Sequence, residues 1–88
     1  MNSTFVLKAL AEETRIEIIR FLLTGKKNVT RISAHVKKSQ PNTSLALRQL
    51  LIVGIIEQEK EGREVYYKIS QPEKIITLLE LVEAIQKK

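Results

Sequence analysis

Seven basic side chains occupy the middle of the chain, between Glu17 and Glu57, without an acidic neighbour. They are Arg20, Lys26, Lys27, Arg31, Lys37, Lys38 and Arg48. The rest of the chain holds eight basic and ten acidic residues, so this stretch carries all of the net charge of +5. Positive charge concentrated in this way attracts a polyanion, and a nucleic acid is the first candidate. A basic surface that is merely solvated is the alternative interpretation.

The same stretch contains a short polar break that predicts two helices joined by a tight turn, a helix-turn-helix between Val29 and Gly54. The second helix is expected over 40–53, because Ser39 is a good N-cap and Pro41 is tolerated in a first turn. Gly54 is expected to end it. At about 100° per residue, one arc of this helix should face the core and the other solvent. The expected inward residues are Ser44, Leu47, Leu50 and Leu51, and the expected outward ones are Asn42, Leu45, Ala46 and Gln49.

An outward arc of amides and small or apolar groups suits the DNA major groove. Asparagine and glutamine can each form two hydrogen bonds to adenine, and aliphatic groups can contact the thymine methyl. Taken singly, Leu45 and Ala46 are ordinary helix formers, so the hypothesis rests on the set. The candidates for reading bases are Asn42, Thr43, Leu45, Ala46 and Gln49. The candidates for contacting the DNA backbone are Lys26, Lys27, Arg31, Lys37, Lys38, Ser39, Gln40, Ser44, Arg48 and Arg63.

Other elements must position this unit. Apolar periodicity predicts helices over 5–11, 14–23 and 30–36, the second of them ending before Gly25. After Gly54 the pattern alternates, which predicts a β-hairpin with its turn at 61–63 and its apolar face on the helices. Pro72 begins a last helix that runs to about Lys87.

Half of the last helix is apolar, more than one buried face requires. In a chain of 88 residues we expect this surplus to form a homodimer interface. A helix covered only by its own core is the alternative. The chain is therefore predicted to be a single DNA-binding domain over 1–88, with a dimerisation helix over 72–88. The expected interface residues are Leu7, Leu10, Ile75, Leu78, Leu79, Val82 and Ile85.

Composition narrows the possible functions. There is no cysteine and one histidine, His35, so thiolate metal sites, disulfides and thiol chemistry are excluded. No glycine-rich phosphate loop or nucleophile motif is present, so we expect neither an enzyme nor a cofactor. His35 has no histidine or aspartate at ligand spacing, so we expect no metal site. No segment approaches the roughly 20 apolar residues of a membrane span, and we expect a cytoplasmic protein without membrane contact.

The order of elements is similar to that of a winged helix-turn-helix, and three motifs resemble the ArsR/SmtB family of small dimeric repressors. An opening segment, a recognition-helix segment and a wing segment carry the likeness. They read LKALAEETRIEIIRFLL (7–23), SQPNTSLALRQLLIVGII (39–56) and EGREVYYKI (61–69). The resemblance implies a mainly α fold with a small β-hairpin, of order ααααββα, that works as a dimer. Two departures stand out: Ala46 replaces the family's recognition-helix histidine, and the cysteine or histidine sets of its metal sensors are absent.

The expected function is a homodimeric, sequence-specific regulator of transcription, a repressor, that binds double-stranded DNA at a near-palindromic operator. A winged-helix module that binds a protein without DNA specificity is the alternative, although it has no need for the acid-free central stretch. RNA binding is a weaker variant, since only Tyr66 and Tyr67 could stack on unpaired bases. The residues do not identify an effector, the operator sequence or the target genes.

Overall fold

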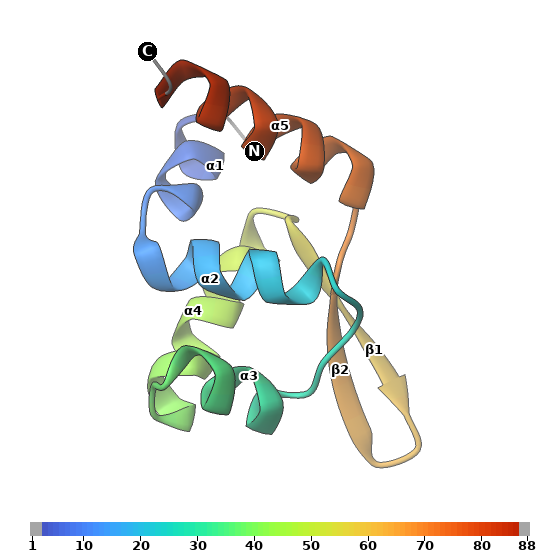
Figure 1. Ribbon diagram of the computed structural model, residues 1–88. Helices are drawn as coiled ribbons and strands as arrows, with labels where there is room; N and C mark the ends of the chain where they lie inside the picture. Colours follow the sequence, from blue (N-terminus) through green and yellow to red (C-terminus); the bar gives the residue numbers. More distant parts are fainter. Residues whose placement is uncertain (1–2, 87–88) are drawn as a thin grey trace.

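The computed structural model describes residues 3–86, which form five helices and one two-stranded sheet that lies at the side of the helices (Figure 1). The elements, in chain order, are α1 (Ser3–Leu10), α2 (Glu13–Leu22), α3 (Val29–Val36), α4 (Gln40–Ile52), β1 (Ile56–Glu61), β2 (Glu64–Ile69) and α5 (Pro72–Gln86). This order confirms the predicted succession of helices and hairpin, and the bounds differ from the prediction by only a few residues.

Side-chain caps fix where the central helices begin. The Glu12 carboxylate accepts hydrogen bonds from the backbone N–H groups of Thr14 (2.9 Å) and Arg15 (3.1 Å). Asn28 caps α3 in the same way, and the Ser39 hydroxyl accepts from the backbone N–H of Asn42 at 3.2 Å. Each cap satisfies a donor that has no partner inside its helix. The two helices of the helix-turn-helix therefore start where the polar residues of the sequence predict.

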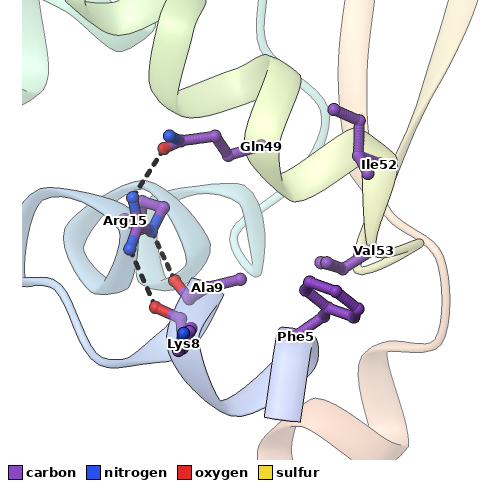
Figure 2. A pocket seen from close by; sticks show the side chains of 7 residues that line it. All are labelled: Phe5, Lys8, Ala9, Arg15, Gln49, Ile52 and Val53. Atoms are coloured by element: carbon purple, nitrogen blue, oxygen red, sulfur yellow. Dashed lines mark hydrogen bonds between the residues drawn. The ribbon is translucent and has the colours of Figure 1, made fainter. Parts of the chain in front are cut away.

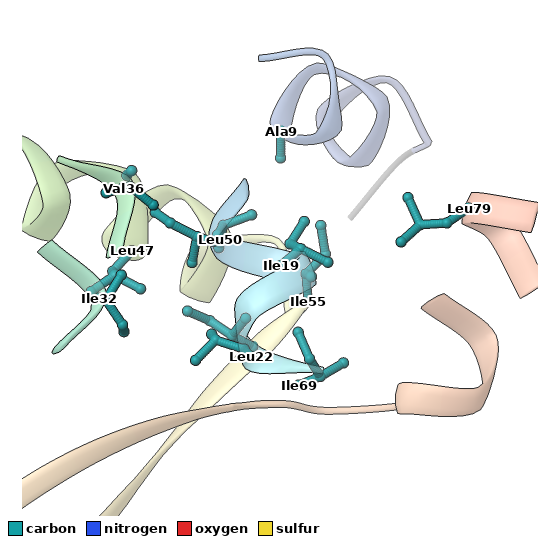
Figure 3. Close-up of a cluster of buried hydrophobic side chains, with 13 residues drawn as sticks. Ala9, Ile19, Leu22, Ile32, Val36, Leu47, Leu50, Ile55, Ile69 and Leu79 are labelled. Atoms are coloured by element: carbon teal, nitrogen blue, oxygen red, sulfur yellow. The ribbon is translucent and has the colours of Figure 1, made fainter. Parts of the chain in front are cut away.

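The core is a single cluster of aliphatic side chains gathered around α2 (Figure 3). Ile18 and Ile19 are fully buried at its centre, together with Ile32 of α3 and Leu50 of α4. Ile56 and Ile69, the outer ends of β1 and β2, close the cluster on the hairpin side. Because α2 contacts α1, α3, α4 and β2, it is the element that sets the position of α4.

The hairpin is antiparallel, and Glu61 pairs with Glu64 across a two-residue turn. Gly62 in that turn has φ 60°, a conformation that glycine adopts without a steric penalty. Lys27, between α2 and α3, pairs with Tyr67 of β2 through two backbone hydrogen bonds of 3.1 and 2.8 Å. The link between α2 and α3 thus ties the hairpin to the helical body.

α5 crosses the end of the molecule where α1 lies, and α2 separates it from α3 (Figure 1). Leu79 is 8% exposed and belongs to the core of its own protomer, with Ile75 packed beside it. Leu79 therefore anchors α5 to the body of its own protomer, and it also lines the groove between α1, α2 and α5, so its expected place at a dimer interface stays a prediction. Among residues 3–86, no helix is both long enough and apolar enough to cross a membrane.

Candidate nucleic-acid interface

The exposed face of α4 is rotated relative to the one expected from the helical wheel. Thr43 is completely buried and Ala46 is 7% exposed, so neither side chain is available to a base. Ser44, expected to face the core, is exposed. The base-reading roles expected for Thr43 and Ala46 are therefore wrong for this structure. The inward stripe is Thr43, Ala46, Leu47 and Leu50.

Close packing of α3 against α4 explains the rotation. The stripe follows the i, i+3, i+4, i+7 spacing of a buried helix face, with two small residues near the N-terminus and two leucines toward the C-terminus. Only three residues separate α3 from α4, and Lys37 among them takes a left-handed conformation with φ 58°. Small side chains suit a joint where two helices lie this close. Leu51, expected in the core, is only half-buried.

The solvent-facing side of α4 contains amide, hydroxyl, aliphatic and guanidinium groups. Leu45 is 58% exposed, a large value for a leucine side chain. The exposed residues on this side are Pro41, Asn42, Ser44, Leu45, Arg48, Gln49 and Ile52. No acidic residue occurs anywhere in α4. This face offers hydrogen-bond donors and acceptors, one positive charge and an apolar group, which are the elements of groove recognition.

Basic side chains border this face at the turn of the helix-turn-helix. Lys37 and Lys38 are exposed between α3 and α4, and Arg31 is exposed on α3. Lys38 lies near the N-terminal half of α4, since it lines the same shallow hollow as Asn42 and Leu45. The Gln40 amide approaches the Thr30 hydroxyl at 3.4 Å, which links the starts of the two helices. Of the positive charges predicted from the sequence, Lys37 and Lys38 therefore lie next to the start of α4.

Lys26 and Lys27 have other partners in the structure. The Lys26 ammonium forms ion pairs with Glu59 and Glu61 of β1 and lies 5.2 Å from the Tyr66 ring centroid. The Lys27 ammonium donates to the Thr24 hydroxyl and the Gly25 carbonyl. The expected phosphate contacts of these two lysines are not supported. The Lys26 ammonium is directed to the hairpin, and the Lys27 ammonium is directed to the link between α2 and α3.

The ion pairs of the wing shift the acidity of their members. Hydrogen bonds from Lys26 and then from Lys68 lower the pKa of Glu59 to about 2. The same contacts with Glu59 raise the pKa values of Lys26 and Lys68 above their ordinary range. Both lysines are neutralised by carboxylates, so the wing adds little positive field of its own. Arg63 remains exposed at the hairpin turn.

One contact on this face joins residues that are 34 positions apart and that no local sequence pattern connects. The Arg15 guanidinium donates from Nη1 to the Gln49 amide oxygen at 2.6 Å (Figure 2). It also donates to the Ala9 carbonyl at 2.6 Å and to the Lys8 carbonyl at 2.8 Å. These carbonyls belong to the last turn of α1, where acceptors lack intrahelical partners. Arg15 therefore joins α1 to the exposed face of α4.

The described residues contain no group of three or more histidine, cysteine, aspartate or glutamate side chains arranged to hold a metal ion. His35, the only histidine, stacks on Phe21 with ring centroids 3.9 Å apart and an angle of 3° between the planes. The Lys27 ammonium lies 4.8 Å from the centroid of the Phe21 ring. His35 thus has a packing partner on α2.

A second exposed surface lies at the other end of the molecule. A groove of about 360 Å³ runs between α1, α2 and α5, and Leu7, Leu10, Ile16, Leu78 and Val82 are among its lining residues. Leu7 is 59% exposed, Val82 43%, and Ile85 at the end of α5 79%. Leu10, Ile75 and Leu78 are half-buried. Most of the residues expected at a dimer interface therefore gather on this side, where the protomer leaves them partly uncovered.

Comparisons with known proteins agree on one family. The model described as "Bacterial regulatory protein, arsR family" matches residues 12–58. The transcriptional activator HlyU of Vibrio cholerae is 31% identical over 84 residues, which cover 96% of this chain and 77% of that protein. A probable mercury resistance operon repressor of Streptomyces lividans is 29% identical over 65 residues, covering 74% of this chain. The chain matches about half (52%) of that repressor's length.

Solved structures support the same grouping. A homodimeric winged helix-turn-helix DNA-binding domain from Mycobacterium bovis superposes with a TM-score of 0.83 at 30% identity, covering 94% of this chain and 76% of that one. The structure of HlyU from Vibrio cholerae superposes with a TM-score of 0.81 at 28% identity, covering 98% and 92%. The winged helix-turn-helix architecture expected from the sequence is confirmed.

Proposed function

The chain belongs to the ArsR family of bacterial regulatory proteins, and from this premise we propose that it is a dimeric regulator of transcription that binds double-stranded DNA through α4. The similar proteins named above include both a repressor and an activator. We propose repression as the mode of action, in which the bound protein occupies an operator. We propose that it acts in the cytoplasm and that its function needs no catalytic step.

One observation carries this proposal: α4 presents an exposed, acid-free face, and exposed basic residues border its start. A major groove accepts an α-helix, and the base edges there present donors, acceptors and the thymine methyl. Asn42, Leu45 and Gln49 are the residues we propose to contact bases. Backbone contacts fall to the exposed polar and basic side chains around them, which are Arg31, Lys37, Lys38, Ser39, Gln40, Ser44, Arg48 and Arg63.

Dimerisation is proposed to use the groove between α1 and α5. Leu7, Val82 and Ile85 together leave a large apolar area in water in the isolated protomer, and a second copy would cover it. A two-fold axis through this surface repeats the same contacts on both partners. The two copies of α4 would then read half-sites about one helical turn, roughly 34 Å, apart on a near-palindromic operator.

The salt dependence of DNA binding tests this assignment. Replacing two phosphate-contacting lysines in Lys37→Ala/Lys38→Ala should weaken binding to every sequence. It should also reduce the slope of log K against log salt by about 3.6, because the dimer loses four lysine contacts and each contributes about 0.9. Fluorescence anisotropy with a labelled duplex measures both quantities.

The double variant Lys27→Ala/Lys74→Ala is the matched control. It removes the same charge from the link before α3, where the Lys27 ammonium bonds Thr24 and Gly25, and from α5, and it should leave the slope close to that of the unmodified protein. Equal slopes for all three proteins would refute the assignment of the turn between α3 and α4 as the phosphate-contacting surface.

A further inference from the structure

We propose that Arg15 determines which base Gln49 reads, by holding the Gln49 amide so that it presents only its NH₂ group to the DNA. This inference rests on the proposed function, since it concerns the same face of α4. It assigns a positioning role to a residue outside the recognition helix. It also predicts guanine, and not adenine, as the base that Gln49 prefers.

The orientation of the amide follows from the chemistry of its partner. A guanidinium has five N–H donors and no acceptor, so the Gln49 atom that faces Arg15 at 2.6 Å must be the carbonyl oxygen. Figure 2 shows that oxygen directed toward Arg15. Because the amide nitrogen is bonded to the same carbon, it lies on the side of the group away from the guanidinium.

Arg15 is itself held in place, so it does not simply follow the glutamine. Its Nε donates to the Ala9 carbonyl and its Nη2 to the Lys8 carbonyl, which fixes the plane of the guanidinium against the end of α1. Three hydrogen bonds from one planar group restrict its rotation. Turning the Gln49 oxygen toward DNA would break one of them and leave Nη1 without this acceptor.

This geometry changes what Gln49 can recognise. The two-bond contact of glutamine with adenine needs the amide oxygen to accept from N6 and the amide nitrogen to donate to N7, both aimed at one base. With the oxygen directed at Arg15, the NH₂ group alone faces the groove. Guanine offers two acceptors there, N7 and O6, whereas adenine and thymine offer one each and cytosine offers a donor. The expected preference is guanine first and cytosine last.

Selection of bound duplexes from random DNA tests this inference. Gln49→Ala should erase the base preference at one position of each half-site, which identifies the position that Gln49 contacts. At that position the unmodified protein should favour guanine. Arg15→Met removes the donors and frees the amide oxygen, so the guanine-to-adenine ratio should fall about 5-fold, the effect expected of one neutral hydrogen bond.

Three further variants separate this role from a structural one. Arg20→Met removes an arginine from the same helix that pairs with Glu83, and it should leave the preference unchanged. Arg15→Met/Gln49→Ala should have no preference at this position, as for Gln49→Ala alone. Gln49→Lys retains Arg15 and can only donate, so it should select guanine as the unmodified protein does, even if Arg15→Met fails to fold.

The outcomes distinguish this inference from the proposed function. If the unmodified protein selects no motif, the DNA-binding function itself is refuted. If it selects a motif with adenine at the Gln49 position, or if Arg15→Met keeps the guanine preference, the inference fails and the function stands. The inference is also refuted if, at the Gln49 position of the selected motif, the unmodified protein prefers adenine and Gln49→Lys prefers guanine.

Discussion

Replacing Leu7 by alanine should weaken the proposed dimer about 100-fold without unfolding the protomer. Leu7 lines the groove between α1 and α5 and is 59% exposed in the protomer. The substitution removes three carbons, whose full burial stabilises by about 2.4 kcal/mol. The exposed part of that side chain accounts for about 1.4 kcal/mol per copy. Because the two-fold axis uses each residue twice, the loss is about 2.8 kcal/mol per dimer.

Sedimentation equilibrium without DNA measures the dimer dissociation constant, and circular dichroism checks that the protomer remains helical. Leu45→Ala is a matched control, because Leu45 is 58% exposed and the same atoms are removed, but on α4. Only Leu7→Ala should raise the dissociation constant. If the two variants dimerise equally well, the groove between α1 and α5 is not the interface, and the reasoning from exposed apolar area is refuted.

Two further predictions concern stability. The pKa of Glu59 is about 2 in the folded protein, below its unfolded value of about 4.3. The ionised Glu59 carboxylate therefore stabilises the fold at pH values above its unfolded pKa. This contribution disappears as the pH falls through about 4 toward 2. Urea unfolding should show a difference between the unmodified protein and Glu59→Gln at pH 6 that shrinks by pH 3; a constant difference would contradict this. The Thr43 hydroxyl is buried and has no hydrogen-bond partner among the described residues. Thr43→Val should raise stability by about 1 kcal/mol in thermal unfolding, and a lower melting temperature would contradict it.

Local patterns in the sequence were sufficient to predict the elements and their order. Glycines at positions 25, 54 and 62 all take positive φ, and each lies in a loop or turn where the sequence predicts a break. Ser39 caps α4 as its position before Pro41 predicts. These features depend on neighbouring residues only. A sequence read in one dimension contains all the information they need.

The orientation of α4 depended on its neighbours in space. The helical wheel placed the core on the arc of Ser44, Leu47, Leu50 and Leu51, which holds three of the four leucines of this helix. In the structure, Thr43 and Ala46 share the buried face with Leu47 and Leu50 because α3 lies close to the start of α4. At the start of α4, small side chains occupy the buried face because α3 packs there. The distance between two helices is a tertiary property that the wheel of a single helix does not contain.

The contact between Arg15 and Gln49 shows why residue type alone was insufficient at the candidate site. The two residues are 34 positions apart, and neither has a local pattern that points to the other. From its type, glutamine is a two-bond partner of adenine. With its oxygen engaged by a fixed guanidinium, the same side chain offers only donors. Base preference at this position therefore depends on the joint between α1, α2 and α4, and a substitution on α2 should change it without altering any residue that touches DNA.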